Sequence, residues 1–351
     1  MPKERKDIVS FDVWDPETGE ARDRTLERYV VDGGDGPHVV VIAGSHGDEL
    51  LAIDTAKQLY EELDPEEVSG TVSIVPEANM FAAAHGTRET PTPEIELYED
   101  EERNLNRCFN VADPAEEPDG NITQRLAHHI LRLVVDADYC FDLHTATRPG
   151  YKIDQIRRKT DPDFSSEVQR AQERLVRDSG LEYVIRTRSS SIGSGVLGGV
   201  APRHGVPTVT VEIGGGLYSQ AGLQQYLDVV HNLLRCIDVL PGEPERRSQH
   251  IYRDLVKVSA PTAGEYSALV DPGDLVRDGD VIGWIDTGDG TVQVTAPYDG
   301  LVESVHRKNW VNEGTKLGHI AIRRDRGPIA TLVRALSRTL ESLLSRASTP
   351  S

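Results

Sequence analysis

The fold is decided by residues 38–49, which read HVVVIAGSHGDE. The first five are mostly β-branched and nearly all apolar, which is typical of a short strand buried on both faces. Gly44 and Gly47 then predict a tight turn with unusual backbone angles. We expect a helix from about Leu50 to Leu63 and a second strand at residues 71–75.

The alternation of strand and helix continues outward from this stretch. Apolar periodicity predicts helices at residues 124–135, 166–178 and 226–239, and buried strands at residues 139–144 and 208–213. Such alternation predicts an α/β fold with a mostly parallel or mixed sheet flanked by helices. In sheets of this kind, ligands bind beyond the carboxyl ends of the strands.

The pattern changes after a polar, proline-containing linker at residues 241–249. Residues 251–322 show short alternating strands broken by turns, which predicts a smaller all-β, barrel-like module. Leucines at helical spacing in residues 329–344 predict one amphipathic helix. We therefore expect three parts: a catalytic domain at residues 1–245, a β domain at residues 250–325, and a C-terminal helix and tail at residues 326–351.

Two histidines and a glutamate follow the expected strands. His46 and Glu49 lie three residues apart after the first strand, and His144 ends another strand. Two imidazoles and one carboxylate suit a zinc ion that keeps a fourth position open for water. We therefore expect one Zn2+ per chain, with Asp48 and Asp142 as candidates for contacts to its ligands.

Glu212 closes the strand at residues 208–213, just before three glycines. A carboxylate at the end of an apolar strand is costly unless it is exposed or functional. We interpret Glu212 as a general base that takes a proton from the attacking water and returns it to the leaving nitrogen. The alternative is a strand-end glutamate that only accepts hydrogen bonds from the glycine loop.

At these residues the sequence resembles the succinylglutamate desuccinylase/aspartoacylase family, which are relatives of the zinc carboxypeptidases. Four blocks carry the resemblance, in the family's order and across residues 35 to 240. They are GSHGDE at 44–49, NLNRCF at 104–109, DLHT at 142–145 and VEIGG at 211–215. The resemblance implies that His46, Glu49 and His144 bind zinc and that Glu212 is the catalytic acid and base. Arg88 is similar to the arginine that polarises the scissile carbonyl in this family.

The resemblance further implies that Asn106 and Arg107 contact the substrate, and a planar guanidinium can hold a carboxylate with two hydrogen bonds. The implied activity is zinc-dependent hydrolysis of the amide of an N-acyl amino acid. Some similar members deacetylate N-acetyl-diaminobutyrate. Two alternatives stay open: a zinc carboxypeptidase acting on short peptides, which shares the site, and a non-catalytic metal- or ligand-binding protein.

The β module resembles the lipoyl- or biotinyl-carrier barrel at residues 273–280 and 296–302. Those carriers need a lysine at a hairpin tip, whereas the candidate tip at residues 287–290, TGDG, has none. We therefore expect the module to form a rim of the active site or a subunit contact, and not to carry a swinging group.

The chain has 351 residues and a formal net charge of −20. Such a surface repels nucleic acid and anionic lipid, so we expect neither as a partner. High acidity with few lysines is typical of adaptation to high salt. No apolar run is long enough for a membrane span, residues 1–10 lack the apolar segment of a secretory signal, and three scattered cysteines predict no disulfide framework. We expect a cytoplasmic enzyme, with a homo-oligomer as one option, whose partner is a small N-acyl amino acid.

Overall fold

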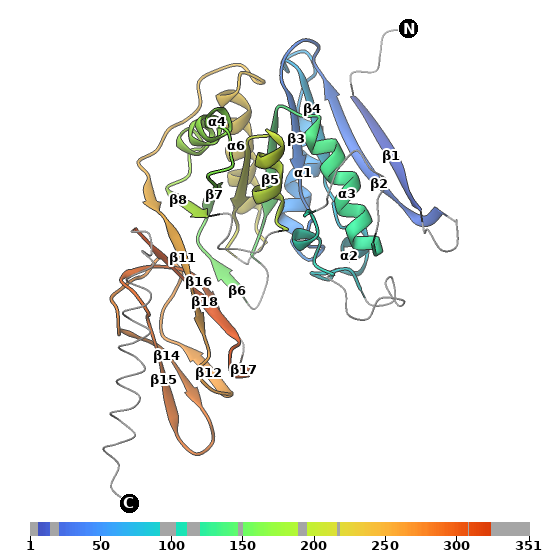
Figure 1. Cartoon of the computed structure of the whole chain (residues 1–351). Helices are drawn as coiled ribbons and strands as arrows, with labels where there is room; N and C mark the ends of the chain where they lie inside the picture. The colour runs from blue at the N-terminus through green and yellow to red at the C-terminus, as the bar shows by residue number, and fades with distance from the viewer. Residues whose placement is uncertain are drawn as a thin grey trace, which may run out of the picture.

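The computed structural model describes residues 6–14, 21–91, 103–110, 120–146, 150–188, 195–215, 218–307 and 309–323. Within these ranges the chain forms a nine-stranded sheet with helices on both faces. A smaller all-β module extends away from one end of that sheet (Figure 1). The expected class, an α/β fold with a mixed sheet and a second, all-β part, is confirmed.

The large sheet runs in the order β1-β2-β4-β3-β5-β9-β7-β8-β10. Parallel pairs join β3 to β4 and β5, β5 to β9, and β8 to β7 and β10. The pairs β1–β2, β2–β4 and β7–β9 are antiparallel, so the sheet is mixed. The strand bounds are β1 Lys6–Trp14, β2 Ala21–Asp32, β3 His38–Ile42, β4 Thr71–Val75, β5 Tyr139–His144, β7 Gln155–Thr160, β8 Tyr183–Arg188, β9 Thr208–Glu212 and β10 His250–Tyr252.

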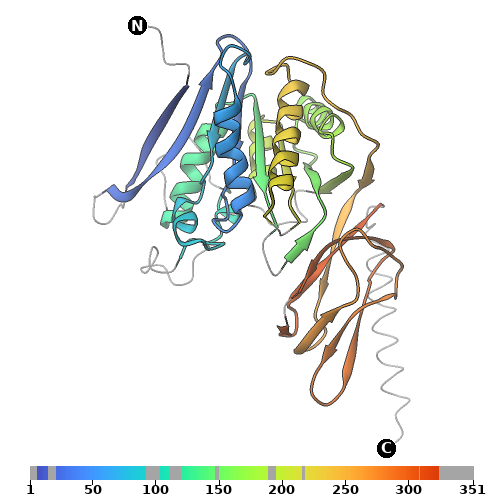
Figure 2. The same ribbon diagram turned by 180° about the vertical axis from the view of Figure 1, so that it is seen from behind.

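The central strands are apolar along their whole length because helices cover both faces. Val39 and Val41 of β3 belong to the core on one face of the sheet. That face is covered by α1 Leu50–Glu62, α4 Ser166–Arg177 and α6 Gln220–Cys236 (Figure 2). Val40 and Ile42 pack on the other face. That face is covered by α2 Met80–His85, α3 Ile122–Val135, α5 Leu197–Val200 and the short turns η2 Leu105–Arg107 and η4 Ala201–His204. Among the described helices, none combines the length and the apolarity that crossing a bilayer requires.

Several elements differ from the sequence expectation. The strand at residues 38–42 is not the first, because β1 and β2 precede it and add an antiparallel edge. Strand β7, QIRRKT, was not expected, because its charged residues hide any apolar alternation. Helix α6 begins at Gln220, before the expected start at Tyr226, because the Ser219 side chain caps it by accepting a hydrogen bond from the Gly222 N–H.

The C-terminal module holds two small sheets, β11-β18-β16-β13 and β15-β14-β12-β17. Its core contains Val258, Ile285, Val302 and Ile320. The expected helix at residues 329–344 lies outside the described residues. The strand bounds are β11 Asp254–Ser259, β12 Gly264–Ala268, β13 Leu275–Val276, β14 Val281–Asp286, β15 Thr291–Thr295, β16 Gly300–His306, β17 Trp310–Val311 and β18 Lys316–Ile322.

The two parts exchange strands at their junction. Strand β6, Gly150–Lys152, leaves the larger part and pairs antiparallel with β16, so that Lys152 stands opposite Ser304. In return, β10, which the sequence assigns to the β module, pairs in parallel with β8 of the large sheet. The expected boundary near residue 250 therefore does not separate two independent sheets.

Candidate metal centre and active site

The turn after β3 brings His46 and Glu49 to the carboxyl end of the sheet. Gly44 has a φ of 69°, a left-handed conformation that glycine adopts without strain. Gly47 lies so close to α2 that an added Cβ would stand 2.0 Å from the carbonyl carbon of Ala82. Glu49 occupies the N-cap position of α1, so the start of this helix fixes its backbone. The two glycines therefore permit the tight turn that presents both side chains.

Three buried side chains converge at this edge: His46, Glu49 and His144. Nδ1 of His46 lies 2.7 Å from Oε1 of Glu49, and Nδ1 of His144 lies 2.8 Å from Oε2. The candidate ligand atoms all lie within 4.8 Å of one another. The structure thus brings together the three predicted metal ligands.

Polar neighbours engage both imidazoles at their other nitrogen. Oδ1 of Asn104 lies 3.2 Å from Nε2 of His46, and Oδ1 of Asp142 lies 3.2 Å from Nε2 of His144. Contacts of this kind orient a histidine and select the nitrogen that is left for a metal. The two Nδ1 atoms and the Glu49 carboxylate are therefore the groups that face a cation.

The electrostatics of the cluster favour a cation. Burial by itself would raise the pKa of the Glu49 carboxyl, but His46 and His144 outweigh it and hold that pKa well below its usual value. Burial by itself would lower the pKa of His144, but Asp142 and Glu49 outweigh it and raise that pKa well above its usual value. A divalent ion can replace the protons that such a cluster attracts. Two imidazole nitrogens and one carboxylate oxygen, all buried, fit the donor set of zinc.

Glu212 lies beside this cluster. It is the register partner of His144, because β9 pairs in parallel with β5. Nζ of Lys152 donates to Oε1 of Glu212 at 2.7 Å, and Nη1 of Arg157 lies 3.4 Å from the same oxygen. Burial would raise the pKa of this carboxyl, but Lys152 and Arg157 outweigh it and lower the pKa. Glu212 is therefore ionised at neutral pH, which is the form that a general base requires.

The three predicted substrate contacts lie at different places around the cluster. Nη1 of Arg88 donates to Oε1 of Glu49 at 3.1 Å, and the Arg88 side chain is 48% exposed, so it stands at the open side. Nδ2 of Asn106 lies 3.1 Å from Nε2 of His144. Arg107 is exposed, and its guanidinium donates to the carbonyl oxygen of Asn106. Arg88 and Asn106 thus contact the cluster directly, and Arg107 contacts Asn106.

Three further residues at the site were not predicted from the sequence. Lys152 and Arg157 lie on β6 and β7, two short strands without an apolar signal, and no local pattern links them to Glu212. Asn104 opens the NLNRCF block, so a signal for it was present, although no role followed from the sequence.

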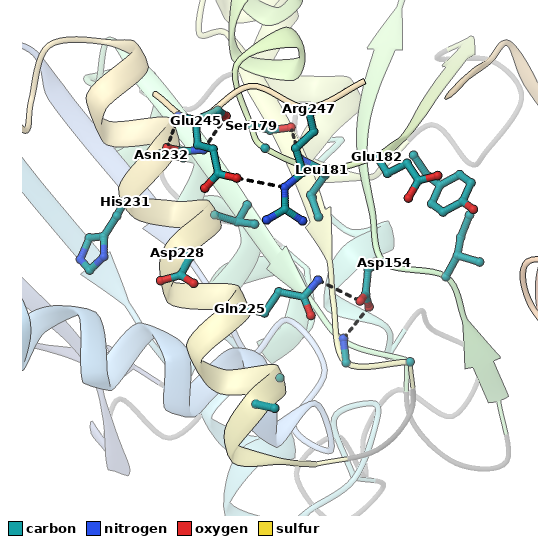
Figure 3. A pocket seen from close by; sticks show the side chains of 18 of the residues that line it. Asp154, Ser179, Leu181, Glu182, Gln225, Asp228, His231, Asn232, Glu245 and Arg247 are labelled. Carbon is teal, nitrogen blue, oxygen red and sulfur yellow. Dashed lines mark hydrogen bonds and ion pairs between the residues drawn. The ribbon is translucent and has the colours of Figure 1, made fainter. Parts of the chain in front are cut away.

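A cavity of about 950 Å³ lies on the α6 face of the large sheet. Asp154 and Gln225 line it and are hydrogen-bonded to each other, as Figure 3 shows. Lys152 and Gly214 also line the cavity, but the His46, Glu49 and His144 side chains do not. The cavity therefore meets the site at Lys152, which contacts Glu212, and is not the space around the metal ligands.

The fold and the site together define an α/β protein with a buried centre of two histidines and one glutamate, suited to a metal ion. The chain belongs to the succinylglutamate desuccinylase/aspartoacylase family, because the model of that family's catalytic domain matches residues 35–237. A second family model, described as biotin-requiring enzyme, matches residues 256–320. The β14–β15 turn in that region, residues 287–290, contains no lysine. That this module carries no swinging group stays a prediction.

Individual relatives share much of the chain. This chain is 28% identical over 315 residues to the N-alpha-acetyl-L-2,4-diaminobutyric acid deacetylase of Halomonas elongata. The aligned region covers 83% of this chain and 84% of that protein. It superposes on the product-bound ectoine utilization protein EutE (DoeB) of Ruegeria pomeroyi with a TM-score of 0.77 and 22% identity, covering 92% of this chain and 97% of that one. A succinylglutamate desuccinylase/aspartoacylase from Rhodobacter sphaeroides gives a TM-score of 0.76 and 23% identity, covering 92% and 95%. These structural matches establish a shared fold.

Proposed function

We propose that this chain hydrolyses the amide bond of an N-acyl amino acid and releases a carboxylate and a free amine. The observation that carries the proposal is the position of Glu212, the register partner of His144 and beside the His46–Glu49 pair. Family membership and the deacetylase name of the Halomonas relative support the same class. A non-catalytic binding protein has no need of an ionised, buried carboxylate at this place.

The roles of the residues follow from their contacts. His46, Glu49 and His144 would hold one zinc ion. That ion would supply polarisation of the amide carbonyl and a lowered pKa of the attacking water. Glu212, buried and ionised, accepts the proton of the water and passes it to the leaving nitrogen. Lys152, 2.7 Å from Oε1, keeps the carboxylate oriented for both transfers.

The substrate contacts come from the open side of the cluster. Arg88, which contacts Glu49 there, suits the negative charge that develops on the carbonyl oxygen. Arg107 offers a planar guanidinium to a substrate carboxylate, with Asn106 beside it. Because the Halomonas relative is named for removing an acetyl group from a diamino acid, we propose an acetylated diamino acid as the first substrate class to test.

Metal content and hydrolysis, measured on the same preparation, test the proposal. The chain is purified in high salt, and bound metal is quantified. Release of free amine is then assayed from a panel of N-acetyl amino acids and from dipeptides, with and without chelator. We expect about one zinc per chain and chelator-sensitive cleavage of the N-acetyl substrates. A preference for dipeptides would support a carboxypeptidase instead, and a chain that binds no metal would contradict the proposal.

Glu212→Gln tests the general base while keeping the size of the side chain. We expect kcat to fall by about 10²–10⁴-fold, with unchanged metal content because Glu212 is not one of the three ligands. The matched control is Glu265→Gln, an exposed glutamate on β12, which should keep the wild-type kcat. Turnover that survives in Glu212→Gln would refute this role.

A further inference from the structure

The C-terminal module places one buried glutamate against the catalytic part. Glu303, on β16, is 0% exposed. It accepts a hydrogen bond from Nε2 of Gln155 at 2.5 Å and another from Nη2 of Arg157, both on β7 of the large sheet. The backbone pairing of β6, which carries Lys152, with β16 fixes the same junction. A carboxylate of the β module is therefore held at the edge of the site that contains Glu212.

Arg157 is shared between two carboxylates. Its Nη2 contacts Glu303, its Nη1 lies 3.4 Å from Oε1 of Glu212, and its Nε donates to Gln155 at 3.1 Å. Burial would lower the pKa of the guanidinium, but Glu212 and Glu303 outweigh it and raise the pKa. The pKa of Glu303 is held well below its usual value, because Arg157 outweighs the effect of burial. The rigid fork of an arginine can bridge two acceptors in this way.

Oppositely charged side chains from both parts of the chain meet at this junction. Lys152 and Arg157 come from β6 and β7, and Glu212 and Glu303 come from β9 and β16. Nδ1 of His319 lies 3.3 Å from Oε2 of Glu303, but burial lowers the pKa of this histidine, so it adds no charge at neutral pH. Without Glu303, Nη2 of Arg157 would lose its carboxylate partner, and the buried guanidinium would no longer be held in one orientation.

We propose that Glu303 is a positioning residue for the hydrolysis. It holds Arg157 at the position from which Nη1 of that arginine reaches Oε1 of Glu212. This inference rests on the proposed function, because it assigns a partner to the general base. The C-terminal module then serves the active site through β16. This role does not require the carrier lysine that the β14–β15 turn lacks.

Two substitutions test the inference. In Arg157→Gln we expect kcat to fall, because Glu212 loses the guanidinium that lies 3.4 Å from its Oε1. In Glu303→Gln we also expect kcat to fall by about 10–100-fold, the range seen for residues that orient catalytic groups. KM should change by less than about twofold, because the substrate loses no contact.

The matched control is again Glu265→Gln, an exposed glutamate of the same module. If Glu303→Gln has the kcat of this control, the inference is overturned. A rise in KM as large as the fall in kcat would overturn it as well, because it would indicate a lost substrate contact.

Folding and function are separated by two further measurements. If Glu303→Gln does not fold, the charge-balanced double variant Arg157→Gln/Glu303→Gln decides. Its kcat should equal that of Arg157→Gln, because Glu303 acts through Arg157, and a further loss of roughly tenfold would contradict the inference. A wild-type chain inert on every amide would overturn the proposed function as well. An active chain that loses turnover in Glu212→Gln but not when Glu303 is changed would overturn this inference by itself.

Discussion

A buried lysine makes the pH dependence of stability predictable. Lys159, on β7, is 8% exposed, and its Nζ has no hydrogen-bond partner among the described residues. Burial first, and then the charges of Arg157 and Arg107, lower its pKa to about 7, with the Asp254 carboxylate opposing them. The perturbation is Lys159→Met, which keeps most of the apolar stem and removes the amine.

The sign follows from which state holds the proton. Below pH 7 the folded and unfolded chains both carry the charged lysine, and the folded chain bears the full cost of burying it. Between pH 7 and the ordinary pKa of 10.5, the unfolded chain keeps a proton that the folded chain has lost, so stability rises with pH. At 1.36 kcal/mol per pKa unit, the difference corresponds to an upper limit of about 5 kcal/mol. Lys159→Met should therefore stabilise the chain most at pH 6 and progressively less toward pH 10.

Urea unfolding at a series of pH values from 6 to 10, in high salt, measures this effect. Lys257→Met, which changes an exposed lysine on β11, is the control and should leave the pH profile unchanged. The reasoning is refuted if Lys159→Met is no more stable than the wild type at pH 6. It is refuted equally if the difference in unfolding free energy between the two does not shrink as the pH rises from 7 to 10.

Three further predictions concern the site. Asp142→Asn should weaken zinc binding by about 10–100-fold, because this carboxylate lies 3.2 Å from Nε2 of His144, and competition with a chelator measures the change. Arg107→Lys should raise KM for N-acyl amino acids with little change in kcat, because an ammonium cannot hold a carboxylate with two parallel hydrogen bonds; steady-state kinetics decide. Gly47→Ala should lower the unfolding free energy by about 1–3 kcal/mol, because its Cβ would meet the carbonyl carbon of Ala82 at 2.0 Å. An unchanged zinc affinity, KM or unfolding free energy would contradict the corresponding prediction.

The apolar centre of the fold could be predicted from local sequence. Strands β3, β4, β5 and β9 lie at, or within one residue of, their expected bounds, because a strand buried on both faces is nearly all apolar. Strand β7 could not be predicted in this way. Its Arg157 pairs with Glu212 and Glu303, so the residues that make it a buried strand are charged, and their partners lie far away in the chain.

The meeting of the candidate site residues could also be predicted from the sequence, because they lie at the ends of the predicted central strands. His46 and Glu49 follow one central strand, and His144 and Glu212 end two others. Parallel strands present their carboxyl ends at one edge of the sheet, so residues at these ends meet once the strands are assigned. Their meeting could be predicted, whereas the catalytic roles stay proposals until the substitutions are made.

By itself, the sequence determined the succession of the central strands and helices along the chain, the residues able to bind a metal, and the net charge of −20. These depend on residue type and on spacing along a single element. Only the tertiary structure decided that β6 and β10 cross between the two parts, and that Glu303 reaches Arg157 from 146 positions along the chain. The physical reason is that a buried charge is stabilised by whichever opposite charge the packing brings to it, and local sequence does not record that partner.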